Sequence, residues 1–331
     1  MKKSITFIIL ILALGGYFFM DGEITGKVTE TNSFVADIGD VQVYFCPHED
    51  CTSALTQFLE TAEESIHCAV FELDLPEVQK VILNKQKEID VKVVTDNDYL
   101  YEFDHSFVKT DTWGLMHNKF CIVDSKKVST GSMNPTVNGA NKNNNNLLLI
   151  NSVTTANNYE DEFQEMWSGT FKKGNNVKNP SVMVNDIQLE MYFCPEDDCA
   201  DKIEEELEKA EQSIHFMTFS FTHEGIGNTL LLKDLDGVHV EGVMEARQVS
   251  KYSRFEQLSY QDIDVIKDGN KQNMHHKVFI VDESTVITGS MNPSAGGDSR
   301  NDENLIIIRD STIASEFMEE YRFVKGEALD K

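Results

Sequence analysis

The sequence predicts an α/β protein of two similar lobes, because strand-like and helix-like segments alternate along the chain and their order then repeats. Residues 41–172 form the first predicted lobe and residues 187–331 the second. Early landmarks, such as Tyr44–Pro47 and Tyr192–Pro195, lie 148 residues apart, whereas later motifs lie 158 residues apart. The second lobe therefore has ten extra residues, which we place within 242–261. Alternating strands and helices imply a sheet with helices on its faces, and a duplication of this size suggests a pseudo-twofold axis.

The first lobe supplies the order of elements that the second lobe repeats. Its strand patterns cover Val41–Phe45, Ser65–Phe71, Asp90–Thr95 and Leu147–Ile150. Its helix patterns cover Thr52–Glu64, Leu75–Gln86 and Asn157–Trp167. A polar and aromatic stretch from Tyr99 to Phe107 interrupts this alternation, and we interpret it as an active-site loop.

The segments outside the lobes are an apolar N-terminus, a spacer and a linker. Residues 1–21 begin with two lysines and continue as an apolar run up to Met20, which is about the shortest length for a membrane-spanning helix. We predict an uncleaved membrane anchor; the lysines then place the catalytic part outside the cytoplasm. A cleaved signal peptide, and hence a secreted protein, is the alternative. Residues 22–40 are a predicted juxtamembrane spacer, and the Asn-rich segment 173–186 a predicted linker.

One motif occurs twice with every spacing kept. Residues 117–134 and 275–292 both fit H-x-K-x4-D-x6-G-S-x-N. Alternate residues of a strand point to the same side, so His117 projects with Lys119, and His275 with Lys277. If the pseudo-twofold axis joins the two copies, one cleft holds two imidazoles, two ammonium groups, two hydroxyls and two amides. That set matches a phosphodiester.

The paired motif resembles the signature of the phospholipase D superfamily. Residues 275–292, the following Asn301–Ile308 and the upstream Glu245–Gln248 are most similar to its small endonuclease and cardiolipin-hydrolase branch. The resemblance implies two pseudo-twofold-related phospholipase D-like lobes, each a mixed sheet flanked by helices. It also implies a two-step hydrolysis through a phosphohistidine that needs no metal or other cofactor.

The candidate catalytic residues come from both copies of the motif. The resemblance gives the nucleophile role to His117 and the acid role to His275, with Lys119 and Lys277 compensating the phosphate charge. Asp124 and Asp282 complete the motif, although we expect them to anchor a strand end or a lysine. The candidate substrate-binding residues, which follow each motif as hydroxyl or amide donors, are Ser132, Asn134, Ser290 and Asn292.

The two halves differ at one position that bears on catalysis. In the family, a carboxylate downstream of each motif hydrogen-bonds a catalytic imidazole. Glu303 occupies that place after the second motif, whereas Asn145 occupies it after the first. One of the two histidines therefore lacks an anionic partner, and the sequence does not say which.

The six cysteines fall into two groups. Cys46 and Cys51, and likewise Cys194 and Cys199, are separated by four residues, and in an exported protein each pair can close a small disulfide. A four-thiolate zinc site joining the repeats and free thiols are the alternatives. Cys68 and Cys121 lie in apolar strands, and we expect them to be small core residues.

The charge of the chain bears on its substrate. The formal net charge is −27, which disfavours sequence-independent binding of nucleic acid. Together with the predicted anchor, this charge favours a phospholipid at a membrane surface over a long polyanion. We expect a monomer, since one chain carries both motifs. An endonuclease with the same mechanism and a non-catalytic phosphate-binding scaffold are the alternatives.

Overall fold

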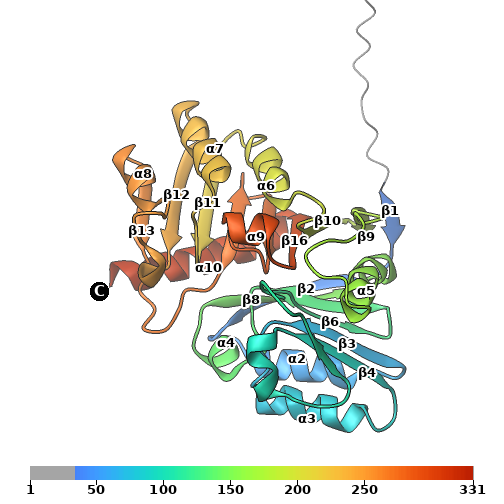
Figure 1. Ribbon diagram of the computed structural model, residues 1–331. Helices are drawn as coiled ribbons and strands as arrows, with labels where there is room; N and C mark the ends of the chain where they lie inside the picture. The colour runs from blue at the N-terminus through green and yellow to red at the C-terminus, as the bar shows by residue number, and fades with distance from the viewer. Residues whose placement is uncertain (1–33, 331) are drawn as a thin grey trace, which may run out of the picture. The chain divides into compact units, whose positions relative to one another are not determined.

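The first lobe is a seven-stranded mixed sheet with helices on its faces. The structure, a computed structural model, describes residues 34–330. In sheet order the strands are β2 (Asp40–Cys46), β8 (Asn145–Asn151), β7 (Lys127–Gly131), β6 (Lys119–Val123), β3 (Ser65–Val70), β4 (Asp90–Thr95) and β5 (Val108–Thr110). The helices are α2 (Cys51–Glu60), α3 (Pro76–Lys85), α4 (Val137–Asn141) and α5 (Val153–Trp167), with a 3-10 turn η1 (Asn97–Glu102). Figure 1 shows α2 and α3 together on one face of this sheet.

The second lobe repeats this topology. Its strands β10 (Ile187–Cys194), β16 (Glu303–Arg309), β15 (Thr285–Gly289), β14 (Lys277–Val281), β11 (Ser213–Thr218), β12 (His239–Met244) and β13 (Asp264–Lys267) follow the same order. Its helices are α6 (Cys199–Leu207), α7 (Glu224–Leu235), α8 (Phe255–Tyr260), α9 (Ala295–Ser299) and α10 (Ser311–Leu329), with the turn η2 (Ala246–Gln248). The two pseudo-twofold-related lobes and their mixed sheets are thus confirmed. Most of the extra residues of the second lobe lie between β12 and β13, around α8.

The predicted spacer and linker are more ordered than the sequence suggested. Two further strands, β1 (Val35–Asp37) and β9 (Ser181–Val184), extend the second sheet to nine strands. They pair in parallel, and β9 pairs with β10 (Figure 1). The end of the spacer and much of the linker therefore belong to the second sheet, because backbone pairing there satisfies polar groups that a free linker would leave to water.

The largest hydrophobic cluster is shared by the two lobes. It combines apolar side chains of both sheets with side chains of α5 and α10, among them Phe120, Phe163, Ile280 and Phe317. Two smaller clusters fill the space between each sheet and its outer helices. The shared cluster holds the two sheets together, and it fixes the start of β6 relative to the start of β14.

All six cysteines are in disulfides, which corrects one expectation. Cys46–Cys51 and Cys194–Cys199 are paired, as the disulfide hypothesis proposed. Cys68 and Cys121 are also paired rather than free core thiols. They face each other on the neighbouring antiparallel strands β3 and β6, a register that the sequence did not reveal.

The predicted anchor, residues 1–21, lies outside the described residues, as does most of the spacer. Among residues 34–330, no helix is both long and apolar enough to cross a membrane.

Candidate active site

The two motifs meet at the seam between the lobes, where each is held by the backbone of the other lobe. The N–H of His117 donates to the carbonyl of Asp302 at 2.9 Å, and the N–H of His275 donates to the carbonyl of Asn144 at 2.9 Å. Short parallel bridges, Met116 with Asp302 and Asn144 with Met274, flank these bonds. Since β6 and β14 begin two residues after the histidines, both imidazoles sit at the entry of a fully buried strand.

Each imidazole is oriented by a side chain of the opposite lobe. The Nδ1 atom of His117 lies 2.7 and 2.8 Å from the two carboxylate oxygens of Glu303. The Nδ1 atom of His275 lies 2.9 Å from Oδ1 of Asn145 and 3.2 Å from the carbonyl of Ser132. Because Nδ1 must donate to these acceptors, the proton of each neutral ring is on Nδ1 and Nε2 is unprotonated. The anionic partner therefore belongs to His117.

The motif lysines and two phenylalanines surround the rings in the same way in both lobes. Lys119 Nζ donates to the carbonyl of His117 at 2.7 Å, and Lys277 Nζ donates to that of His275 at 2.8 Å. Phe71 packs edge-on against His117, and Phe219 against His275, with ring centroids 4.8 and 4.6 Å apart. Each lysine also lies over the phenylalanine of its own lobe. The apolar rings thus shield one side of the site from water.

Burial and mutual repulsion keep the histidines neutral. Burial, followed by the charges of Lys119 and Lys277, holds the pKa of His117 well below its usual value. The same causes lower the pKa of His275, to which the nearby His117 also contributes. Burial lowers the pKa of Lys119 to about 8 and that of Lys277 well below its usual value, and it raises the pKa of Glu303 to about 7. The free site is therefore short of negative charge and suited to an anion.

The motif serines do not offer free hydroxyls to a substrate. Ser132 and Ser290 are fully buried. The hydroxyl of Ser132 donates to Oδ1 of Asn145 at 3.1 Å, and that of Ser290 donates to the carboxylate of Glu303 at 2.6 Å. They therefore position the residues that orient the histidines, and direct binding of phosphate by these hydroxyls stays a prediction.

The motif asparagines differ from the serines, because part of the hydrogen-bonding capacity of their side-chain amides is unused. Asn134 is half-buried, and its amide lies 3.4 Å from Glu72. The side-chain oxygens of Asn134 and Asn292 have no hydrogen-bond partner in the described part of the chain. Substrate binding by these two residues stays a prediction.

The motif aspartates are anchors and lie at the far ends of β6 and β14. The carboxylate of Asp124 accepts hydrogen bonds of 2.7–3.1 Å from the N–H groups of Glu63, Glu64 and Ser65. Asp282 does the same for residues 211–213. Four strand residues lie between each aspartate and its lysine. The anchoring role that we expected is confirmed, and a part in catalysis stays a prediction.

Several residues of the site were missing from the sequence analysis. Phe71 and Phe219 are equivalent positions of the repeat, and that match was the available signal. Lys172, which we placed at the end of the first lobe, is buried and forms ion pairs with Asp111 and Asp302. These ion pairs join the lobes next to the hydrogen bond from the backbone N–H of His117 to the carbonyl of Asp302. No sequence pattern relates the three residues.

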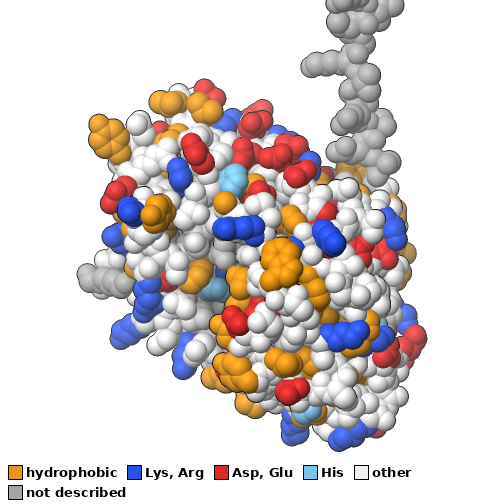
Figure 2. Space-filling model, viewed as in Figure 1, with side chains coloured by type: hydrophobic (Ala, Val, Ile, Leu, Met, Phe, Trp, Pro, Cys, Tyr) orange, Lys and Arg blue, Asp and Glu red, His pale blue; other side chains and the backbone are white. Residues whose placement is uncertain are grey.

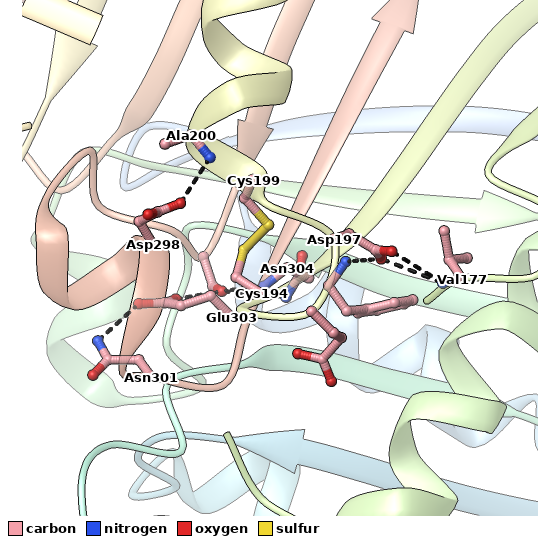
Figure 3. Close-up of a disulfide and its surroundings, with 12 residues drawn as sticks. Val177, Cys194, Asp197, Cys199, Ala200, Asp298, Asn301, Glu303 and Asn304 are labelled. Carbon is pink, nitrogen blue, oxygen red and sulfur yellow. Dashed lines mark hydrogen bonds between the residues drawn. A yellow bond between two sulfur atoms is a disulfide. The ribbon is translucent and has the colours of Figure 1, made fainter. Parts of the chain in front are cut away.

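The small disulfides lie directly behind the orienting residues. Cys194 on β10 lies opposite Glu303 on the neighbouring strand β16, and Cys46 on β2 lies opposite Asn145 on β8. Figure 3 shows the Cys194–Cys199 bond next to Glu303, whose carboxylate also accepts a hydrogen bond from Asn301 at 3.2 Å. Each disulfide thus ties the strand beside an orienting residue to the following helix.

Comparisons with known proteins agree with this geometry. The family model "Cardiolipin synthase, PLD-like domain" matches residues 55–167 and 203–323. The Phospholipase D of Rickettsia conorii is 33% identical over 161 residues, 44% of this chain and 80% of that protein. The Phospholipase D of Rickettsia typhi is 33% identical over 130 residues, 39% of this chain and 64% of its own length. The Mitochondrial cardiolipin hydrolase of Xenopus tropicalis is 32% identical over 133 residues, 37% of this chain and 63% of that protein.

Among solved structures, the phosphatidylserine synthase of Haemophilus influenzae has a TM-score of 0.64 at 14% identity. The match covers 84% of this chain and 85% of that chain, a likeness of fold. The family match extends over most of both lobes, and each lobe carries one complete motif. The chain therefore belongs to the phospholipase D superfamily of phosphodiesterases.

Proposed function

We propose that this chain hydrolyses a phospholipid phosphodiester through a phosphohistidine on His117. The observation that carries the proposal is the crossed orientation of the rings: Glu303 holds Nδ1 of His117 and Asn145 holds Nδ1 of His275, so that neither neutral ring carries its proton on Nε2. One chain supplies both rings, so a monomer suffices. Nothing in this arrangement requires a second subunit.

The first step uses the two histidines in opposite protonation states. Nε2 of His117 attacks phosphorus, and His275 donates a proton from Nε2 to the departing alkoxide. The carboxylate of Glu303 stabilises the positive charge that develops on His117 as the N–P bond forms. His275 has a proton source within reach, since Lys277 Nζ lies 3.0 Å from its Nε2. In the second step His275 takes a proton from water, the oxygen attacks phosphorus, and the N–P bond breaks.

The lysines supply the charge compensation that phosphoryl transfer needs. Lys119 and Lys277 are buried beside the rings, where their charges are weakly screened. A bound phosphodiester brings negative charge into the site and so favours the protonated forms of the lysines and of His275. The substrate itself thereby helps to prepare the acid.

The surroundings of the site support a lipid over a long polyanion. Glu72 is close enough to Lys119 and Asp74 to interact electrostatically with both. Tyr99 packs on Phe71, and the 76% exposed Tyr101 continues this aromatic row outwards. In the face seen in Figure 2, acidic side chains gather over α6 while lysines and arginines lie in small groups. A predicted anchor in residues 1–21 would hold this site against a bilayer outside the cytoplasm.

A parallel assay of three substrates tests the proposal. The purified full-length chain is incubated with phosphatidylcholine vesicles, cardiolipin vesicles and single-stranded DNA, with a chelator present and folding verified by circular dichroism. We expect product from lipid and none from the variants His117→Ala and His275→Ala. Cleavage of DNA alone would identify an endonuclease, and no turnover of any substrate by the folded protein would favour a phosphate-binding scaffold.

The roles of the histidines are tested by trapping the intermediate. Bis(p-nitrophenyl) phosphate has a leaving group that departs without a proton, so His275→Ala should still form the adduct but hydrolyse it slowly. After an alkaline quench, mass spectrometry of peptides should find the phosphoryl group on His117. An adduct on His275 in the wild-type chain would reverse the assignment.

A further inference from the structure

A second set of buried charges lies at the seam between the lobes, outside the catalytic site. Glu162 on α5 lines a pocket of about 290 Å³ together with Glu165 of the same helix. Glu162 is only 5% exposed. Within residues 34–330 its carboxylate has no hydrogen-bond or ion-pair partner. The charges that act on it most strongly are acidic, with Glu196 and Asp302 first among them. An unpaired buried carboxylate is costly, so this one needs a positive partner.

The pseudo-twofold axis provides an internal comparison. The position of Glu162 on α5 corresponds to that of Glu320 on α10, and both helices border equivalent pockets. Glu320 is also buried, but it contacts His276 at 2.9 Å and His48 at 3.0 Å. Although burial opposes it, these two histidines lower the pKa of Glu320. In the second-lobe helix, therefore, two imidazoles are the partners of the buried carboxylate.

Neither imidazole is present in the pocket of Glu162. The residue equivalent to His276 is Asn118, the neighbour of the catalytic His117, and the residue equivalent to His48 is Glu196. One imidazole has thus been replaced by an amide, and the other by a further carboxylate. Oε2 of Glu196 is buried and has no hydrogen-bond partner within residues 34–330. At these two positions the pocket has oxygen atoms in place of imidazole nitrogens, and Lys178, which also lines it, pairs with Asp161.

We propose that Glu162, Glu165 and Glu196 bind a divalent cation, Ca²⁺, which takes the place of the two histidines at the equivalent position. One carboxylate oxygen of each residue can lie within 4.8 Å of the others. That separation suits an ion whose ligands lie at about 2.3–2.6 Å from it. Carboxylate oxygens are the ligands that Ca²⁺ prefers, and its coordination geometry is more flexible than that of Mg²⁺.

The backbone around the pocket is shaped to bring the carboxylates together. A side chain at Gly174 would collide with both Glu165 and Glu196, so the bare glycine leaves them room to converge. The turn that carries Glu196 is fixed by Asp197, whose carboxylate accepts hydrogen bonds from the N–H groups of Phe193 and Val177 (Figure 3). Glu165 accepts hydrogen bonds from Asn175, and Glu196 accepts one from its own backbone N–H.

The proposed ion would link the two lobes. Glu162 and Glu165 belong to α5 of the first lobe, whereas Glu196 lies in the turn between β10 and α6 of the second lobe. The His48–Glu320 contact makes the corresponding link between α10 and the turn after β2. One seam would thus be closed by an ion pair of side chains and the other by a metal ion. The role is structural and separate from the phosphodiester chemistry.

Calcium binding and thermal stability test this inference without relying on catalysis. The full-length chain is freed of metal with a chelator, exchanged into buffer, and titrated with CaCl₂ or MgCl₂ by isothermal calorimetry. We expect one Ca²⁺ per chain, weaker Mg²⁺ binding, and a higher melting temperature with Ca²⁺. Because a lost ligand charge weakens a calcium site, Glu162→Gln should reduce the affinity by at least about tenfold.

A second variant keeps the test valid if Glu162→Gln is unstable. Glu196→His recreates the histidine–carboxylate pair of the opposite pocket, so it should abolish Ca²⁺ binding. Without metal, the melting temperature of this variant should equal or exceed that of the metal-free wild type. The matched control is Glu316→Gln, an exposed carboxylate of the opposite pocket, which should leave Ca²⁺ affinity unchanged. No Ca²⁺ heat and no shift in melting temperature for the wild type would overturn the proposal and leave the carboxylates sharing protons. Ca²⁺ binding that persists in both pocket variants would also overturn it.

Discussion

The carboxylate of Glu303 should determine the reactivity of His117, and Glu303→Gln removes its charge while keeping its shape. In the wild-type chain both carboxylate oxygens lie within 2.8 Å of Nδ1, so the ring must keep its proton there. Glutamine has one oxygen and one amide nitrogen. If the nitrogen faces the ring, the proton moves to Nε2 and the nucleophilic nitrogen is lost.

The size of the effect follows from these contacts. A hydrogen bond to a charged group contributes about 1.5–3 kcal/mol. Since 1.36 kcal/mol corresponds to tenfold in rate, the lost bond alone should lower kcat about 10- to 100-fold. A reversed tautomer raises the loss towards about 10⁴-fold, as when the aspartate of a serine protease triad is replaced by asparagine. We therefore expect a decrease of about 10- to 10⁴-fold in kcat, with little change in KM.

The equivalent substitution in the other lobe is the matched control. Asn145→Asp gives His275 the charged partner that His117 has, and the new carboxylate should raise the pKa of His275. We expect less than about tenfold loss of kcat, because the tautomer is kept, and a shift of the alkaline limb of the pH–rate profile to higher pH.

The assay follows hydrolysis of bis(p-nitrophenyl) phosphate and of the preferred lipid, with melting curves to confirm folding. A Glu303→Gln variant that folds and keeps kcat within about threefold of wild type would refute the orienting role of Glu303. A large loss in Asn145→Asp, together with a small loss in Glu303→Gln, would assign the nucleophile to His275.

Three further predictions concern the scaffold. Asp124→Asn should lower the free energy of unfolding by about 2 kcal/mol at neutral pH, because three backbone N–H groups lose a charged acceptor, with kcat/KM of the folded protein unchanged. Burial alone would raise the pKa of Asp124, but the hydrogen bonds from these N–H groups lower it below 3.8. In urea melts, the difference in stability between wild type and variant should therefore shrink as the pH falls through that pKa. Gly131→Ala should lower the free energy of unfolding by about 1–3 kcal/mol, because Gly131 has φ +128° and a Cβ would lie 2.6 Å from the carbonyl oxygen of Asn146. Equal melting temperatures of variant and wild type would contradict this prediction. The denatured, unreduced protein should react with no thiol reagent, whereas a labelled Cys68 or Cys121 would disprove the third disulfide.

Pattern alone determined the internal repeat, the order of elements and the identity of the paired histidines and lysines. The repeat is visible because equivalent positions must bury the same kinds of side chain in both lobes, and the spacing within each motif is set by strand geometry. Strand Asp90–Thr95 was predicted with its observed bounds, and α5 and β8 began only a few residues earlier than predicted. These features depend on neighbours close in sequence.

The tertiary structure decided which distant residues meet. The sequence offered Glu303 and Asn145 as orienting residues, but only the crossing of the lobes assigned Glu303 to His117, 186 residues away. Likewise, the register of β3 against β6 paired Cys68 with Cys121, and the packing of β7 against β8 directed the hydroxyl of Ser132 to Asn145 instead of the substrate. Glu162 on α5 is buried where Glu196 of the second lobe lies close to it. Such contacts depend on how two surfaces come together, and no local pattern of one chain segment contains that information.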